Sequence, residues 1–153
     1  MRYYTFKEKN KKEMNQFIDK NVFFAFSNEQ FEKGLQKLSE KHPKLNLSME
    51  NYQDHLYSWV GGGFVLKSAQ KEERQMWKRM HKHERKYLSG FKNLVDALEY
   101  EMGNHECNYT GRYTDALRPL GFSRKDLEKN KRLRKAFCIA KKKQYEWYEK
   151  HGW

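Results

Sequence analysis

The side chains with the greatest capacity for chemistry lie in one stretch, residues 101–122. Glu101, His105, Glu106 and Asp115 are residue types that hold a catalytic metal ion or act as a general acid and base. A metal-dependent nuclease that uses His105 and Glu106 is therefore one hypothesis for this stretch.

The alternative for the same stretch is structural. Asn104, His105 and Thr110 are residue types that cap helices and lock turns through hydrogen bonds to the backbone. In this interpretation Tyr109 and Tyr113 pack beside the turn. We favour the structural interpretation and assign no catalytic residue.

Two short runs contain metal-ligand residue types, His81-Lys82-His83 and His105-Glu106-Cys107. Residues i and i+2 of a helix point about 200° apart, so His81 and His83 do not share one ion. The zinc deaminase signature needs H-x-E and a later P-C-x-x-C, and the chain has neither. We expect no metal site and no cofactor.

The elements that must position these residues are mostly helical. Apolar residues recur at helical spacing in five segments, residues 14–18, 31–38, 77–88, 91–102 and 133–147. Three shorter apolar runs favour strands, residues 22–26, 56–60 and 64–67. The glycines at 61–63 predict a hairpin turn between the last two runs. We predict an α+β, mostly helical single domain whose small antiparallel β-sheet is covered by the helix over 91–102.

Three serines predict where helices begin. Ser27 is followed three residues later by Gln30, the spacing of a capping box. Ser68 is a suitable N-cap for a long charged helix that ends near Tyr87, and Ser123 for a last helix over residues 123–150. The first helix is expected to be short, around residues 14–18, with a frayed basic lead-in.

The charge of the chain indicates its class of partner. The 153 residues carry a net charge of +12, and 16% of them are aromatic, enough for one core despite a hydrophobic fraction of 37%. Lys and Arg outnumber Asp and Glu by 6 to 3 in the basic N-terminal segment 1–20, by 7 to 3 in 71–87 and by 11 to 4 in 123–153. The other segments together are close to neutral or acidic. Such segregation is typical of a surface that binds a polyanion such as RNA.

The cations expected to contact phosphates lie on two helices: Arg74, Lys78, Arg79, Lys82, Arg85, Lys86, Lys131, Arg132, Lys135, Lys142 and Lys143. Interleaved aromatic residues are candidates for stacking on unpaired bases, with core packing as the alternative: Trp77, Tyr87, Tyr145, Trp147, Tyr148 and Trp153.

Two cysteines, Cys107 and Cys138, are too few for a disulfide framework and have no C-x-x-C spacing, so we expect a reducing, cytoplasmic setting. Cys138 lies between Phe137 and Ile139, which favours an inert buried thiol. No run approaches the roughly 18 apolar residues of a membrane span, and the first residues lack the apolar core of a signal peptide.

Three motifs resemble those of a family of small uncharacterised proteins from bacterial genomes and their phages: Phe23-Phe24-Ala25-Phe26-Ser27, Gly61-Gly62-Gly63-Phe64-Val65-Leu66-Lys67-Ser68 and Asn104-His105-Glu106-Cys107-Asn108-Tyr109-Thr110-Gly111. The resemblance spans roughly residues 22–135, and the basic segments on either side look like departures from it. It implies a phage or mobile-element setting, in which an inhibitor of host defence of the anti-CRISPR type is one expectation.

Taken together, the residues favour a non-enzymatic protein that binds RNA or a ribonucleoprotein and has no membrane partner. Two alternatives stay open, the metal-dependent nuclease and a module that binds only protein.

Overall fold

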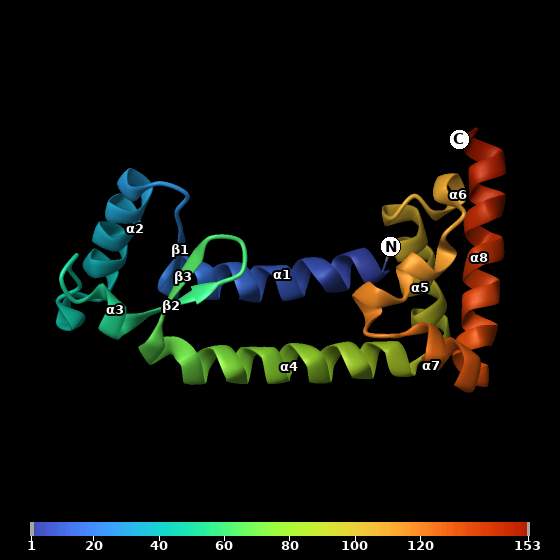
Figure 1. Ribbon diagram of the computed structural model, residues 1–153. Helices are drawn as coiled ribbons and strands as arrows, with labels where there is room; N and C mark the ends of the chain where they lie inside the picture. The colour runs from blue at the N-terminus through green and yellow to red at the C-terminus, as the bar shows by residue number, and fades with distance from the viewer. Residues whose placement is uncertain (1, 153) are drawn as a thin grey trace. The chain divides into compact units, whose positions relative to one another are not determined.

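A computed structural model describes residues 2–152 of the chain (Figure 1). Its helices are α1 (Arg2–Asn21), α2 (Asn28–Lys41), α3 (Tyr52–His55), α4 (Gln70–Ser89), α5 (Phe91–Asn104), α6 (Cys107–Thr110), α7 (Arg124–Lys129) and α8 (Lys131–His151). Short 3₁₀ turns cover Pro43–Leu45, Lys67–Ala69, Tyr113–Ala116 and Arg118–Leu120. The strands are β1 (Val22–Phe24), β2 (Leu56–Trp59) and β3 (Gly63–Leu66). This confirms the α+β, mostly helical fold with one small antiparallel sheet.

The chain divides into two compact units, each with its own hydrophobic core. Unit 1 combines the residues up to Glu8 with those from Lys82 onward, and unit 2 is Lys9–His81. Helices α1 and α4 each contribute residues to both units. The single-domain organisation of residues 1–153 stays a prediction.

Unit 2 contains the sheet, in the order β1-β3-β2 with both pairs antiparallel. Val22 lies opposite Val65, and Leu56 lies opposite Leu66. The predicted glycine turn joins β2 to β3, where Gly61 and Gly62 adopt φ angles of +86° and +80° that disfavour any side chain. The core of this unit consists of Phe17, Val22, Leu35, Leu38, Leu47, Leu56, Val65, Leu66, Ala69 and Met76.

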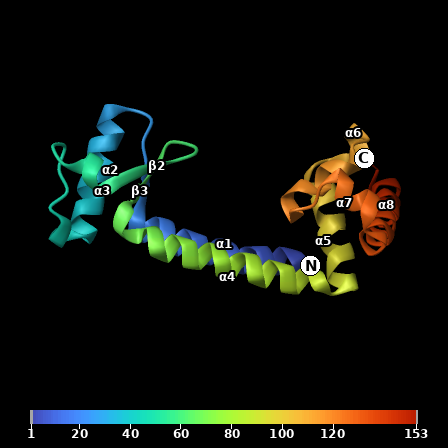
Figure 2. The ribbon, with the colours of Figure 1, turned by 60° about the horizontal axis from the view of Figure 1, so that its bottom comes forward.

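Helix α2 begins as predicted, because the Ser27 side chain accepts a hydrogen bond from Gln30 N. Helix α4 begins two residues after Ser68, since Lys67–Ala69 form a 3₁₀ turn that buries Ala69. The predicted N-cap at Ser68 was therefore wrong. Within unit 2, α1 lies beside the first part of α4 (Figure 2), joined by an ion pair between Arg79 Nη2 and Glu13 Oε1 at 2.7 Å.

Unit 1 is built on α5 and α8. The α5 side chains Leu94, Leu98 and Met102 and the α8 side chains Leu133 and Ala140 are almost fully buried in one core. We expected the helix over 91–102 to cover the sheet, and this was wrong. Its apolar stripe packs against α8 instead, a choice of partner that the spacing of the stripe does not specify.

The first helix is longer than expected. α1 is continuous from Arg2, and Tyr3 is only 1% exposed in the core of unit 1. The Phe6 ring stacks on the Tyr87 ring with centroids 4.4 Å apart. The predicted frayed lead-in is thus ordered helix, because its aromatic residues Tyr3 and Phe6 have partners elsewhere in the chain.

The expected single helix over 123–150 is two helices. Ser123 and Asp126 form a reciprocal capping box that begins α7. Asn130 then leaves the helical region, with φ −105° and ψ 104°, and its Oδ1 accepts a hydrogen bond from Leu133 N at 3.1 Å. Asn130 is therefore the N-cap of α8, a role its short polar side chain suits.

None of the helices within residues 2–152 is both long enough and apolar enough to span a bilayer.

Candidate functional site

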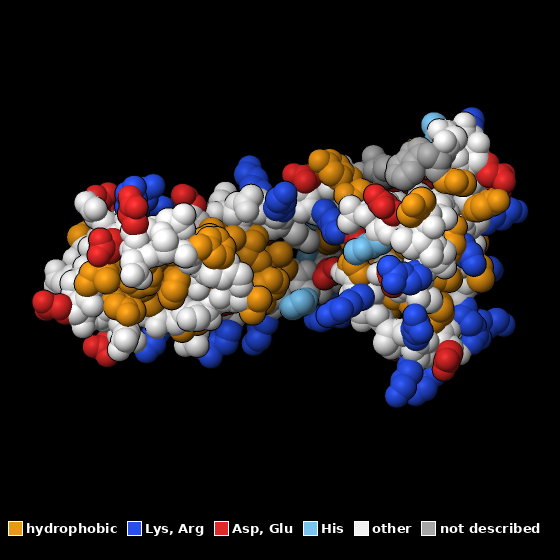
Figure 3. All heavy atoms as spheres, turned by 45° about the horizontal axis from the view of Figure 1, so that its top comes forward, with side chains coloured by type: hydrophobic (Ala, Val, Ile, Leu, Met, Phe, Trp, Pro, Cys, Tyr) orange, Lys and Arg blue, Asp and Glu red, His pale blue; other side chains and the backbone are white. Residues whose placement is uncertain are grey.

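The outward face of α8 carries a row of cations. Lys131, Lys135 and Lys142 are exposed, as are Cys138 and Tyr145 between and after them, at the i, i+4, i+7, i+11 and i+14 spacing of one helix face. Within the described residues, no ion pair or side-chain hydrogen bond engages these three lysines, and residues 131–145 contain no Asp or Glu. Figure 3 shows Lys and Arg side chains projecting along one edge of unit 1. This is the edge at which α8 lies in Figure 1. The face is thus free for an anionic partner.

Two other predicted cations of α8 have partners inside unit 1. Arg132 donates a hydrogen bond to the carbonyl of Ser89 and lies 5.8 Å from the centroid of the Phe91 ring. Lys143 lies close enough to Glu99 to act on the pKa of that carboxyl. Both lie on the flanks of α8, so their first role is to hold the helix and its neighbours together.

The predicted cations of α4 fall into two groups. In unit 2, Arg74 and Lys78 are exposed, whereas Arg79 Nε and Nη2 both bind Glu13 Oε1, at 3.1 and 2.7 Å. An arginine held in this fork has less capacity for a phosphate.

In unit 1, the last turns of α4 present Lys82, Arg85 and Lys86 to solvent. Like the three lysines of α8, these side chains have no ion pair within residues 2–152. They add to the positive charge of unit 1.

The aromatic residues predicted to stack on bases differ in their surroundings. Trp77 is 38% exposed, and its Nε1 donates to Glu73 Oε1 at 3.4 Å. Tyr87 packs against the core of unit 1. Tyr145 is 49% exposed on the same face as the α8 lysines, so it is the best placed for base stacking. Trp153 lies outside the described residues.

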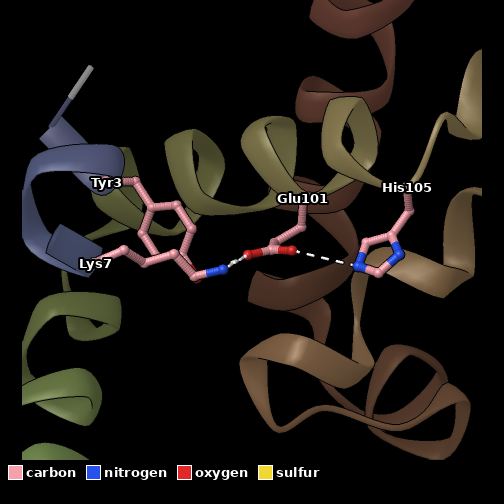
Figure 4. A network of polar contacts seen from close by, with 4 residues as sticks. All are labelled: Tyr3, Lys7, Glu101 and His105. Carbon is pink, nitrogen blue, oxygen red and sulfur yellow. Dashed lines mark hydrogen bonds and ion pairs between the residues drawn. The ribbon is translucent and has the colours of Figure 1, made fainter. Parts of the chain in front are cut away.

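A buried carboxylate links α1, α5 and the stretch that follows (Figure 4). Glu101 is 1% exposed, and its Oε1 pairs with Lys7 Nζ and accepts a hydrogen bond from Tyr3 Oη at 3.1 Å. Its other oxygen, Oε2, lies 3.4 Å from His105 Nε2. Burial, together with the neighbouring Glu101, raises the pKa of Tyr3, so this hydroxyl keeps its proton and acts as the donor.

His105 and Glu106 face different parts of unit 1. His105 lines a shallow cavity with Asp115, Arg118 and other residues, whereas Glu106 lines a separate cavity against α8. Among residues 2–152, no three His, Cys, Asp or Glu side chains are grouped so as to hold a metal ion. The two side chains of the nuclease hypothesis are adjacent in sequence, but they do not converge on one site.

The stretch between α5 and α7 has the hydrogen bonds of a locked turn. Tyr113 Oη donates to Asn108 Oδ1, and Asn108 Nδ2 donates to the carbonyl of Gln144 at 3.1 Å. Gly111 ends α6 with a φ of +73°. Tyr109, expected to pack beside the turn, is 80% exposed instead.

The cavity that Glu106 lines has a volume of about 440 Å³ and lies between α5, α6 and the second half of α8. Three carboxylates and four large aromatic rings line its wall: Asp96, Glu99, Glu106, Tyr100, Tyr109, Trp147 and Tyr148. Burial raises the pKa of Glu99, against the lowering effect of Lys143, and Asp96 adds to the rise. Sequence reasoning missed this cavity. Asp96 and Glu99 are visible at i and i+3 beside the apolar stripe of α5, but Trp147 and Tyr148 come from α8, which is distant in the sequence.

The two thiols differ. Cys107 is fully buried, and burial raises its pKa to about 11. Cys138 is exposed on the lysine face of α8, so the expectation of an inert buried thiol was wrong there. The helical projection that puts Leu133 and Ala136 inside also puts position 138 outside, a stronger signal than its two apolar neighbours in sequence.

Comparison with known proteins gives a family but no activity. Residues 2–143 match DUF7659, a family of unknown function. The chain belongs to that family. No curated protein and no solved structure matches it.

The DUF7659 match corrects one expectation. It includes α1 and α8 up to Lys143, so the basic segment from residue 2 to residue 20 is part of the family domain and no departure from it. Tyr3 in the core of unit 1 and the ion pair of Lys7 with the buried Glu101 give a physical reason for this. The cation face at Lys131, Lys135 and Lys142 also lies inside the DUF7659 domain.

Proposed function

We propose that unit 1 binds RNA, free or within a ribonucleoprotein, on the outward face of α8 and without catalysis. The observation that supports this is the exposed row of Lys131, Lys135 and Lys142, which have no ion pair within residues 2–152 and lie on a stretch of helix that has no carboxylate. Tyr145 continues the same face and offers a ring for an unpaired base.

The distribution of charge between the units supports the same surface. Unit 1 holds 19 Lys and Arg against 11 Asp and Glu, a net charge of +8, whereas unit 2 holds 13 against 9, a net charge of +4. A field of this sign draws polyanions toward unit 1 before any contact forms. Lysines bind phosphates as point charges, so the affinity is expected to depend little on base sequence.

Filter binding of single-stranded RNA at increasing salt tests the proposal. Each phosphate neutralised on a single strand contributes a slope of about −0.7 to the plot of log affinity against log salt. Replacing Lys131, Lys135 and Lys142 together by Gln should therefore make the slope shallower by about 2 and weaken binding at every salt concentration.

A charge-matched control distinguishes the effect of the α8 face on RNA binding from the effect of net charge. Replacing Lys33, Lys37 and Lys44, which are exposed on and after α2 in unit 2, removes the same three charges. The control should keep the wild-type slope. Equal losses in the two triple variants would contradict a specific face, and a flat salt response of the wild-type protein would contradict phosphate binding.

The same preparations test the rival functions. Labelled RNA and DNA incubated with Mg²⁺ or Mn²⁺ should stay intact, and cleavage that His105→Ala abolishes would favour the nuclease. A partner that stays bound after nuclease treatment would favour a module that binds only protein. An inhibitor of host defence in a phage setting is a narrower form of the proposal, and it rests on the motif resemblance and the charge.

A further inference from the structure

The cavity between α5, α6 and the second half of α8 has the opposite character to the lysine face. Within a unit whose net charge is +8, its wall carries the carboxylates of Asp96, Glu99 and Glu106. We propose that this cavity binds an organic ammonium cation of the size of a short diamine or a lysine side chain.

The aromatic part of the wall provides the first reason. Trp147 is 43% exposed and Tyr109 is 80% exposed, although both are large rings that usually bury most of their surface. Tyr148 lines the same cavity and is half-buried. A cation within about 6 Å of such a ring face is attracted by the ring quadrupole, most strongly by that of tryptophan.

The carboxylates provide the second reason. Inside the protein, Asp96 Oδ2 accepts a hydrogen bond from Tyr3 N at 3.3 Å, and Lys143 lowers the pKa of the Glu99 carboxyl. No ion pair within residues 2–152 engages Asp96, Glu99 or Glu106. A bound ammonium would supply the missing positive charge beside a partly desolvated carboxylate.

The size and position of the cavity define the ligand further. A volume of about 440 Å³ suits a small molecule, and a wall of aromatic rings with a few polar groups is typical of such sites. Phosphates and other anions are disfavoured by the three carboxylates. Because Trp147 lies on the inward side of α8 and Lys135 and Lys142 on the outward side, the two surfaces are distinct.

Calorimetric titration with choline and with its neutral isostere 3,3-dimethylbutan-1-ol tests the proposal on the full chain. The two probes have the same shape and differ in charge, so choline should bind about tenfold more tightly. Equal affinities, or no binding of choline, would overturn the proposal without the need for any variant.

Variants then locate the site. Glu99→Gln and Trp147→Leu should each weaken choline binding about fivefold, whereas Trp77→Leu in unit 2 should leave it unchanged. Unchanged binding in both cavity variants would overturn the assignment to this cavity. Titration with 1,4-diaminobutane and with Nα-acetyl-lysine methylamide distinguishes a free diamine from the lysine side chain of a partner protein. The compound that binds more tightly identifies the ligand that fits the cavity better.

Discussion

Lys7 and Glu101 form an ion pair across 94 positions of sequence, and the carboxylate of that pair is 1% exposed. The pair joins the second turn of α1 to the last turns of α5, and it completes the core of unit 1 around Tyr3. A basic residue in the segment that was expected to be a frayed lead-in thus pairs with a carboxylate in the interior. Lys7 neutralises the charge of the Glu101 carboxylate inside the protein. This explains why an acidic residue is buried on the otherwise apolar face of α5.

Replacing Lys7 by Met should destabilise unit 1 by about 2–3 kcal/mol. Breaking a buried pair from one side leaves an uncompensated charge, and the partial exposure of Lys7 reduces the usual cost. Chemical denaturation followed by circular dichroism measures the loss. Lys9→Met on the same helix serves as the control and should change little.

The double variant Lys7→Met with Glu101→Gln should recover most of that stability, because an amide replaces the unpaired charge. A double variant as unstable as the single one would show that Lys7 acts through its packing on the neighbouring aromatic rings, Tyr3 and Tyr100.

Glu99→Gln should stabilise the protein at neutral pH and have no effect in acid. Burial raises the pKa of Glu99 in the folded state above its ordinary value of 4.5, so the folded state binds this proton more tightly than the unfolded state does. Stability is therefore lost as the pH rises through the ordinary and then the folded pKa. The glutamine avoids that loss, and below about pH 4 the two proteins should converge.

Thermal melts of both proteins across this pH range measure the difference. Glu146→Gln, the same substitution at an exposed position of α8, provides the control for the chemical change itself. A gain for Glu99→Gln that persists unchanged into acid would mean that side-chain volume or packing, and not the carboxylate charge, is responsible.

Local signals in the sequence predicted most of the elements. The helix start at Ser27, the glycine turn at 61–62 and the stripe through Leu94 and Met102 all depend on near neighbours in the chain, and the structure confirms each of them. The reciprocal half of the capping box at Ser27 is absent, because Gln30 Oε1 accepts its hydrogen bond from Phe26 N and not from Ser27 N. The end of α7 and start of α8 at Asn130 were not predicted, because apolar residues recur at helical spacing on both sides of it. The only local signal is the Asn130 side chain, which accepts a hydrogen bond from Leu133 N.

Long-range pairing was not predictable in the same way. An apolar stripe specifies that a helix has a partner, but many faces in the chain would satisfy it. This is why the stripe of α5 was matched with the sheet instead of with α8. Two other features depend on which elements pack against α5, and the sequence did not predict them. They are the ion pair of Lys7 with Glu101 and the cavity that Glu99 and Trp147 both line.

Gly34→Ala should destabilise unit 2 by about 1–3 kcal/mol, although Gly→Ala within a helix usually stabilises. A Cβ at position 34 would lie 2.2 Å from Cδ2 of the Phe23 ring. That ring cannot easily move, because it stacks on Phe64 with centroids 5.3 Å apart. Gly103→Ala in α5 is the matched control: its Cβ meets the flexible end of Gln144 at 3.2 Å and should be tolerated. Equal stability of the two variants in denaturant would contradict the close contact at Gly34.

The two cysteines should differ in reactivity toward Ellman's reagent. The thiolate is the reactive form, and burial that raises the pKa of Cys107 to about 11 both withholds the thiolate and blocks access. One thiol, the exposed Cys138, should react in the folded protein, and the second only after unfolding. Rapid reaction of both thiols in the folded protein would contradict the packing of α6.

This selectivity makes Cys138 a probe of the lysine face. The residue lies between Lys135 and Lys142 on the outward side of α8, so a bulky, neutral maleimide at this sulfur would cover both ammonium groups. Labelling should weaken RNA binding about tenfold and make its salt dependence shallower. Cys138→Ser treated with the same reagent should bind like the untreated protein. If full labelling left RNA affinity unchanged, the outward face of α8 would not be the surface that RNA contacts.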